Sequence, residues 1–105
     1  MVKEAVKIGM TLRTALAFAE LYDDIEDNGT SNMDSCVVEF DSINKTFVEI
    51  INEICGGCLS KQRKNSYLVQ IKCNGQGFKR TKKAEVVCEY LNMKGIKSRV
   101  EYNID

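Results

Sequence analysis

Apolar and polar positions repeat along the chain with two different periods, and these periods predict the secondary structure. Residues 3–27 carry apolar side chains at steps of three and four, which predicts an amphipathic helix. Further apolar residues widen its surface beyond one stripe, so we expect burial on more than one side or contact with a second chain. Asn28-Gly29 predicts its end, and residues 28–34 form a polar loop.

The rest of the chain predicts strands that alternate with helices. The predicted strands cover residues 36–40, 66–73 and 96–104. The predicted helices run from Asp41 or Ser42 to Gly56-Gly57 and from near Thr81 to Gly95. The predicted connections are a basic loop over 58–65 and a turn over 74–77. An extra hairpin in place of the second helix stays open as an alternative.

Each of the last two predicted strands has one polar face, which indicates how many faces of the sheet the helices cover. A sheet covered on both faces has continuously apolar strands, which these are not. We therefore predict an α/β or α+β two-layer sandwich in the order α-β-α-β-α-β, with helices packed on one face of a small sheet of three strands or slightly more. The strands could be parallel with right-handed crossovers, or follow a split, ferredoxin-like order.

Length and composition predict one small domain. The 105 residues suit a single domain over 1–105, made of a long apolar helix over 1–27 and a β-α-β-α-β core over 35–105. No apolar run is long enough for a membrane span, and no export signal is recognised, so we expect a cytoplasmic protein without membrane contact. The five cysteines are then expected to be free thiols.

The chain contains no histidine. This absence excludes Ser-His-Asp and Cys-His catalysis and removes the commonest metal ligand. No other set of residues forms a recognisable catalytic constellation. We therefore expect a protein that is not an enzyme and that needs no cofactor.

Charge is unevenly distributed although the net charge is zero. Residues 1–55 carry four basic and eleven acidic side chains, a net charge of −7, and residues 56–105 carry eleven basic and four acidic ones, a net charge of +7. Such asymmetry bears on partners more than on fold. Either the two halves attract one another in the folded protein, or they present charged surfaces to a partner.

The basic candidate surface centres on residues 74–83, which join a strand to a helix start. Backbone N–H groups there favour anions, whereas cationic side chains oppose the helix dipole. The glycine spacing is neither that of a P-loop nor that of a dinucleotide site. The alternatives are an ordinary solvated loop or a site for phosphate, nucleic acid or an acidic protein. The full predicted basic surface is Lys61, Arg63, Lys64, Lys72, Gly75, Gly77, Lys79, Arg80, Lys82, Lys83, Lys97 and Arg99.

The acidic candidate surface lies at the end of the first helix, where carboxylates face the negative end of the dipole. A calcium loop starting at Asp24 fails at its twelfth position, where Ser35 stands in place of glutamate. The alternatives are a solvated helix end or a contact surface. The predicted acidic contact surface is Glu20, Asp23, Asp24, Glu26 and Asp27.

Cys55 and Cys58, separated by two glycines, form the remaining candidate. Such a pair suits a redox dithiol or half of a zinc site. The predicted helix C-terminus disfavours a reactive thiolate at this place. A zinc site needs two further ligands, for which Cys73 and Cys88 are the only later cysteines. Core thiols without chemistry are the alternative to both.

Together, these patterns predict a small cytoplasmic binding protein, a regulator or inhibitor that docks on a macromolecular partner through charged surfaces. Its size and composition are compatible with a phage or mobile-element accessory protein. A protein partner is the first expectation, and the apolar first helix adds a possible homodimer. The alternatives are a nucleic-acid or phosphate-binding module that uses residues 79–83, and a thiol or zinc protein.

Overall fold

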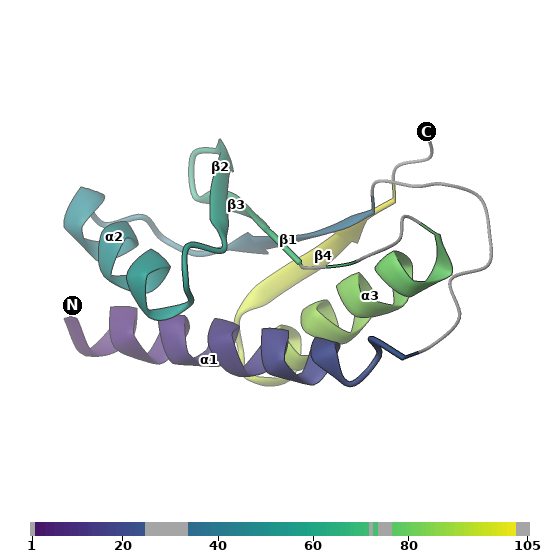
Figure 1. Ribbon diagram of the computed structural model, residues 1–105. Coiled ribbons are helices and arrows are strands. Elements are labelled where there is room, and N and C mark those ends of the chain that lie inside the picture. Colours follow the sequence, from purple (N-terminus) through teal and green to yellow (C-terminus); the bar gives the residue numbers. More distant parts are fainter. Residues whose placement is uncertain (1, 25–33, 72, 74–76, 103–105) are drawn as a thin grey trace.

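The computed structural model of the chain describes residues 2–24, 34–71, 73 and 77–102, which form helices on one side of an antiparallel sheet (Figure 1). The mixed α+β class predicted from the sequence is confirmed. The helices are α1 (Val2–Glu20), α2 (Lys45–Ile54) and α3 (Phe78–Met93). The strands are β1 (Ser35–Glu39), β2 (Leu59–Arg63), β3 (Ser66–Val69) and β4 (Lys97–Glu101). Among the described residues, we find no helix with the length and apolar content that a lipid bilayer requires.

The sheet has the strand order β2-β3-β1-β4, and every neighbouring pair is antiparallel. Two connections pass through a helix, from β1 to β2 through α2 and from β3 to β4 through α3. This is the split β-α-β arrangement of ferredoxin-like folds, preceded here by an additional helix. Of the two strand orders that the sequence left open, the split order is therefore the observed one.

The sheet contains one strand more than the sequence predicted. Residues 58–65, expected to form a loop, include β2, which pairs with β3 in a hairpin. The strand reads LSKQR and carries little of the β-branched and aromatic content that marks a strand. Asn65 makes the tight turn with φ of 62°, a conformation that asparagine tolerates better than most residues. The hairpin follows α2 and does not replace it, so that alternative is wrong.

Several element ends differ from the sequence prediction. Helix α1 ends at Glu20 and not at 27, because three successive N–H groups then bond to the third residue before them and tighten the chain into a turn. Helix α3 begins at Phe78, earlier than Thr81. Helix α2 is capped by the Asn44 side chain, which accepts from the Phe47 N–H at 2.9 Å, and not by residues 41 or 42.

Helix α1 lies in the helical layer and contacts both α2 and α3 (Figure 1). Its buried residues recur at steps of four and three, as an amphipathic helix requires, and are Ala5, Gly9, Leu12, Ala15 and Ala19. They pack into one cluster with Val38 of the sheet, Ile51 of α2 and Leu91 of α3. Part of the predicted wide apolar surface, including Met10 and Phe18, stays exposed. Self-association through this helix remains a prediction.

The contact between α1 and α2 is closest at Gly9. A Cβ atom built at this position would lie 2.8 Å from Cβ of Ile54 and 3.2 Å from the carbonyl oxygen of Ile51. Both distances are shorter than ordinary van der Waals contact. The glycine therefore sets the distance between the two helices.

Replacing Gly9 with alanine tests this contact. We expect Gly9→Ala to lower the free energy of unfolding by about 1–3 kcal/mol, the usual cost of overpacking. The loss should appear although alanine is the better helix former by about 1 kcal/mol. Urea denaturation followed by circular dichroism measures it. The control is Thr14→Ala on the exposed side of α1, and equal stability of both variants would contradict the packing.

Candidate functional site

The first turns of α3 lie against the end of α1, so the predicted basic and acidic surfaces contact one another. Lys83 is only 2% exposed, and its ammonium group forms an ion pair with the Asp23 carboxylate. Lys79 donates from Nζ to the Asp23 carbonyl oxygen at 2.7 Å. The Lys82 ammonium group lies 5.7 Å from the centre of the Tyr22 ring. These three cations therefore have partners within the same chain.

The same part of α3 also holds the chain that leads into β1. Arg80 donates from Nε to the carbonyl oxygen of Asp34 at 3.1 Å, and the Thr81 hydroxyl donates to the Asp34 carboxylate at 2.7 Å. Asp34 is itself buried, as is Gly77 before the helix. The contacts of residues 79–83 support the simpler interpretation of the charge split, in which the two halves attract one another.

The remaining members of these two candidate surfaces are placed as follows. Glu20 and Asp24 are exposed near the end of α1. Glu26, Asp27, Lys72 and Gly75 lie outside the described residues. The structure therefore brings Asp23 together with Lys79 and Lys83, and among the described residues it gives no comparable contact for Asp24.

The outer face of the sheet is a mixed charge network, although a basic face was expected there. Glu39 of β1 pairs with both β4 cations, at 3.2 Å from Lys97 and 2.6 Å from Arg99. Hydrogen bonds from these two side chains hold the pKa of Glu39 below its usual value. Arg99 also lies 3.6 Å from Glu101, which accepts a hydrogen bond of 3.0 Å from Gln62 of β2. Acidic residues that the expected surface omitted thus offset its cations.

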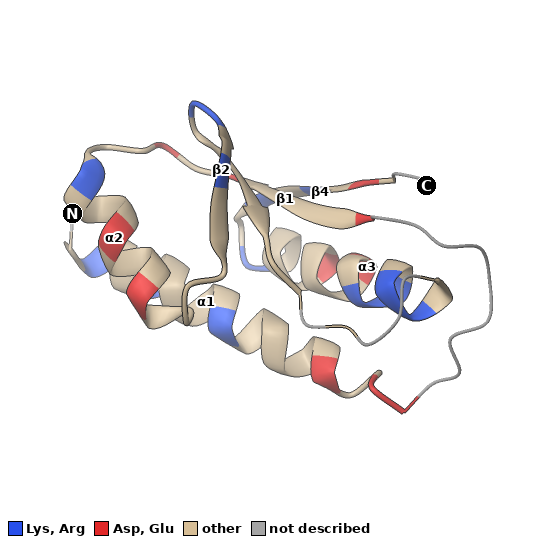
Figure 2. Cartoon of the chain, turned by 45° about the horizontal axis from the view of Figure 1, so that its top comes forward, with Lys and Arg blue, Asp and Glu red and all other residues tan. Residues whose placement is uncertain are grey.

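A second group of cations surrounds a groove of about 650 Å³ between α2 and the β2–β3 hairpin. We call it the hairpin groove. Its lining includes Lys45 at the start of α2, Lys61 of β2 and Lys64 of the turn, and no carboxylate among the described residues. Figure 2 shows these segments in blue, separate from the blue segments of α3. Arg63 is exposed on the same hairpin, and it is not part of the groove lining.

Short polar side chains hold the walls of the hairpin groove in place. The Asn65 side chain accepts from the Ser42 N–H at 2.8 Å, and the hydroxyls of Ser42 and Tyr67 share a hydrogen bond of 2.6 Å. On the other side, Asn52 accepts from the Leu59 N–H at 2.9 Å. Sequence reasoning found Lys61 and Lys64 but missed Lys45, because Lys45 belongs to the acidic half of the chain.

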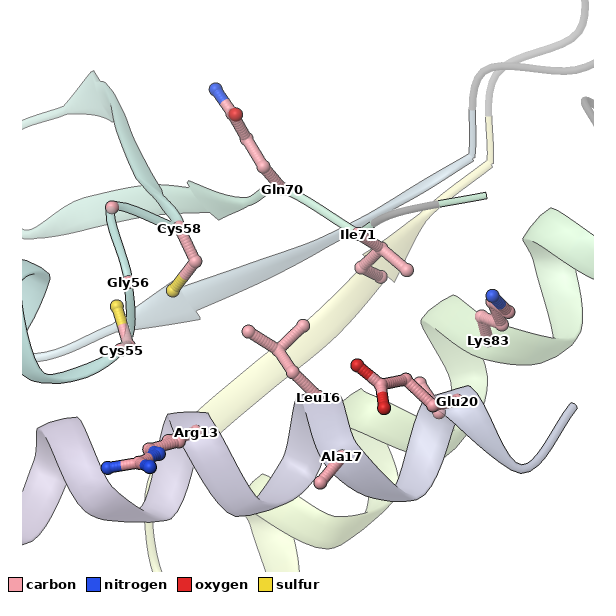
Figure 3. A pocket seen from close by; sticks show the side chains of 12 residues that line it. Arg13, Leu16, Ala17, Glu20, Cys55, Gly56, Cys58, Gln70, Ile71 and Lys83 are labelled. Carbon is pink, nitrogen blue, oxygen red and sulfur yellow. The ribbon is translucent and has the colours of Figure 1, made fainter. Parts of the chain in front are cut away.

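Cys55 and Cys58 line a different hollow of about 460 Å³, the thiol cleft, between α1, the loop after α2 and the residues that follow β3 (Figure 3). Glu20 and Lys83 line its other end. Cys36 is buried against Cys88, and burial followed by contact with that thiol raises the pKa of Cys36 far above its usual range. Four of the five cysteines thus lie in two pairs of neighbouring free thiols, and Cys73 belongs to neither.

The zinc hypothesis lacks its further ligands. Within the part of the chain that the structure describes, no three cysteine or carboxylate side chains converge as a metal site requires. Cys88 is occupied by Cys36 and by the Asn92 side-chain amide, which lies 3.5 Å from its sulfur. The described residues therefore favour the dithiol and core interpretations of the Cys55–Cys58 pair.

We compared the chain with protein-family models, curated proteins and solved structures, and none of the three comparisons found a match. The functional argument consequently depends on the residues and their geometry.

Removing the charge of Asp23 tests its contact with α3. We expect Asp23→Asn to lower the free energy of unfolding by about 1–2 kcal/mol. The reason is that the buried Lys83 ammonium loses its carboxylate, whereas Asp23 itself is half-exposed. Asp24→Asn changes the same charge one residue away and should cost less than about 0.5 kcal/mol. Urea unfolding of both variants decides; an equal effect would show that the Asp23 contact does not stabilise the fold.

Proposed function

We propose that this chain is a cytoplasmic, non-enzymatic binding protein, a regulator or inhibitor that docks through the hairpin groove on an acidic surface of a partner protein. The observation that carries the proposal is the concentration of three lysines in a groove whose described lining contains no carboxylate. Long-range attraction of an acidic partner by such a patch raises the association rate and selects the partner.

Contrast with the other cations supports the hairpin groove as the contact surface. Lys83 and Arg99 form ion pairs within the fold, and Lys79 bonds to a backbone carbonyl. Among the described residues, no ion pair involves Lys61 or Lys64. A partner carboxylate at Lys61 or Lys64 would therefore replace water and counterions, with no internal salt bridge to break, whereas Lys45 already pairs with Glu49 of α2 at 3.9 Å.

A protein partner fits the hairpin groove better than a nucleic acid does. Proteins that bind single-stranded nucleic acids present exposed aromatic rings for base stacking. The aromatic residue in this groove, Tyr67, is buried, and its hydroxyl bonds to Ser42. The other polar lining groups are short amides and a hydroxyl, which suit carboxylate side chains of an acidic protein segment.

Charge reversal in the hairpin groove tests the proposal. A fluorescent polyglutamate peptide and a single-stranded DNA oligonucleotide of equal charge serve as probes, and fluorescence anisotropy at two salt concentrations gives their affinities. We expect the peptide to bind the unmodified chain, and Lys61→Glu with Lys64→Glu to weaken it by about tenfold or more. The matched control is Lys3→Glu with Lys7→Glu, which changes net charge equally on exposed positions of α1 and should have little effect.

Two outcomes would contradict this proposal. Equal losses in the groove variant and the control would mean that net charge, and not the groove, attracts the probe. Groove-dependent binding of the oligonucleotide alone, with a steep loss at raised salt, would establish the nucleic-acid alternative in its place.

A further inference from the structure

The Cys55–Cys58 pair has a geometry that core thiols do not require. Gly56 and Gly57 both adopt positive φ angles, of 81° and 78°, yet a Cβ at either position would meet nothing within 4 Å. The glycines are therefore required by backbone conformation and not by lack of space. They turn the chain back on itself, and Figure 3 shows the two sulfur atoms facing one another beside the thiol cleft.

The end of α2 destabilises a thiolate less than the helix dipole alone would. The N–H groups of Gly56 and Gly57 bond to the carbonyl oxygens of Glu53 and Asn52, at 3.3 and 2.7 Å. This Schellman motif satisfies carbonyls that would otherwise repel a negative charge. In its protonated form, Cys55 also donates to the Asn52 carbonyl oxygen at 3.5 Å. The sequence-based objection to a reactive thiol considered the helix end without this cap.

The pKa values of the two thiols are shifted in opposite directions. A hydrogen bond from the Cys58 thiol, helped by the backbone N–H of Cys58, lowers the pKa of Cys55 to about 7 although this side chain is buried. The same hydrogen bond, followed by burial, raises the pKa of Cys58. These opposite shifts favour Cys55 as the nucleophile and Cys58 as the protonated partner, which is the division of roles that thiol–disulfide exchange uses.

The thiol cleft gives a small molecule access to this pair. Its volume of about 460 Å³ lies within the usual range for small-ligand sites, roughly 300–1,000 Å³. Leu16 and Ile71 form apolar walls beside the sulfurs. Arg13 lies on the α1 side of the opening, is exposed, and forms no ion pair among the described residues. An apolar wall with an available guanidinium suits a disulfide that carries carboxylates.

We propose that Cys55 and Cys58 form a thiol–disulfide exchange site for low-molecular-weight disulfides of the glutathione class, with Arg13 binding a carboxylate of the substrate. This activity is separate from docking at the hairpin groove, because the two hollows share none of their lining residues.

The reaction balances with glutathione disulfide as the oxidant. The Cys55 thiolate, its proton released to solvent, attacks one sulfur of the disulfide, and the first glutathione leaves as a thiolate. Cys58 then loses its proton as its sulfur attacks Cys55 Sγ, which breaks the mixed disulfide and releases the second glutathione thiolate. The protein dithiol loses two electrons to glutathione disulfide and two protons to solvent, and the two released glutathione thiolates take up protons from solvent. The steps are reversible.

Mass spectrometry after incubation with glutathione disulfide tests the assignment of roles. All proteins carry Cys73→Ser, because Cys73 is half-exposed outside the cleft. The parent should lose two hydrogens, Cys58→Ser should retain one glutathione on Cys55, and Cys55→Ser should do neither. Equal reaction of Cys55→Ser and Cys58→Ser, or no reaction in variants whose circular dichroism spectra are native, would overturn the proposal.

Two rate measurements separate a binding site from simple reactivity. Iodoacetamide alkylation of Cys55 should show a midpoint near pH 7, below the value of about 8.5 for an ordinary thiol; a midpoint at or above 8.5 would contradict the exchange site. Arg13→Gln should slow the reaction of Cys55 with glutathione disulfide severalfold and leave the rate of its reaction with the uncharged iodoacetamide unchanged. An equal effect on both reagents would exclude the carboxylate contact.

Discussion

Packing of α1 between α2 and α3 is the constraint on which the rest of the structure depends. The small buried face of this helix, closest to α2 at Gly9, lets it enter the helical layer beneath the split β-α-β sheet. Its C-terminal end then meets the start of α3, where Asp23 contacts Lys79 and Lys83. Its middle forms one wall of the thiol cleft beside Cys55. One packing interaction thus creates both an internal charge contact and a cleft.

This arrangement sorts the charges of the chain into two kinds. Carboxylates or carbonyls that the fold brings from the acidic half balance Lys79, Arg80 and Lys83 of α3 and Lys97 and Arg99 of β4. Around the hairpin groove, Lys45 lies 3.9 Å from Glu49, whereas Lys61 and Lys64 form no ion pair among the described residues. The charge split therefore has a structural part, which stabilises the tertiary fold, and a remaining part, which is available for a partner. Net charge alone could not separate the two.

Periodicity predicted most of the fold because most elements bury one apolar face. The stripe on α1, the alternation in β4 and the glycine end of α2 are all visible in the sequence. The sequence did not predict strand β2, because an edge strand with polar residues lacks the alternation of apolar and polar residues that marks a half-buried strand. The choice between parallel and split strand orders depends on which strands pair over long range. The sequence of residues 36–40 is compatible with both orders.

The candidate sites were predictable as residue types but not as neighbours. The sequence identified Lys83 and Asp23 as members of separate surfaces, and only the fold shows that they pair with one another. Lys45 was missed because it joins Lys61 across a hairpin that was expected to be a loop. The opposite pKa shifts of Cys55 and Cys58 follow from a hydrogen bond between the two thiols, which no spacing rule contains.

The central claim, that the fold uses one set of cations and leaves another available, is tested most directly by lysine labelling of the native protein. Acetylation by an activated ester, followed residue by residue with mass spectrometry, gives a rate for each ammonium group. The account predicts that Lys61 and Lys64 react as fast as the exposed Lys3, whereas Lys83, 2% exposed and ion-paired, reacts far more slowly. Labelling of Lys83 at the rate of Lys61 would contradict it.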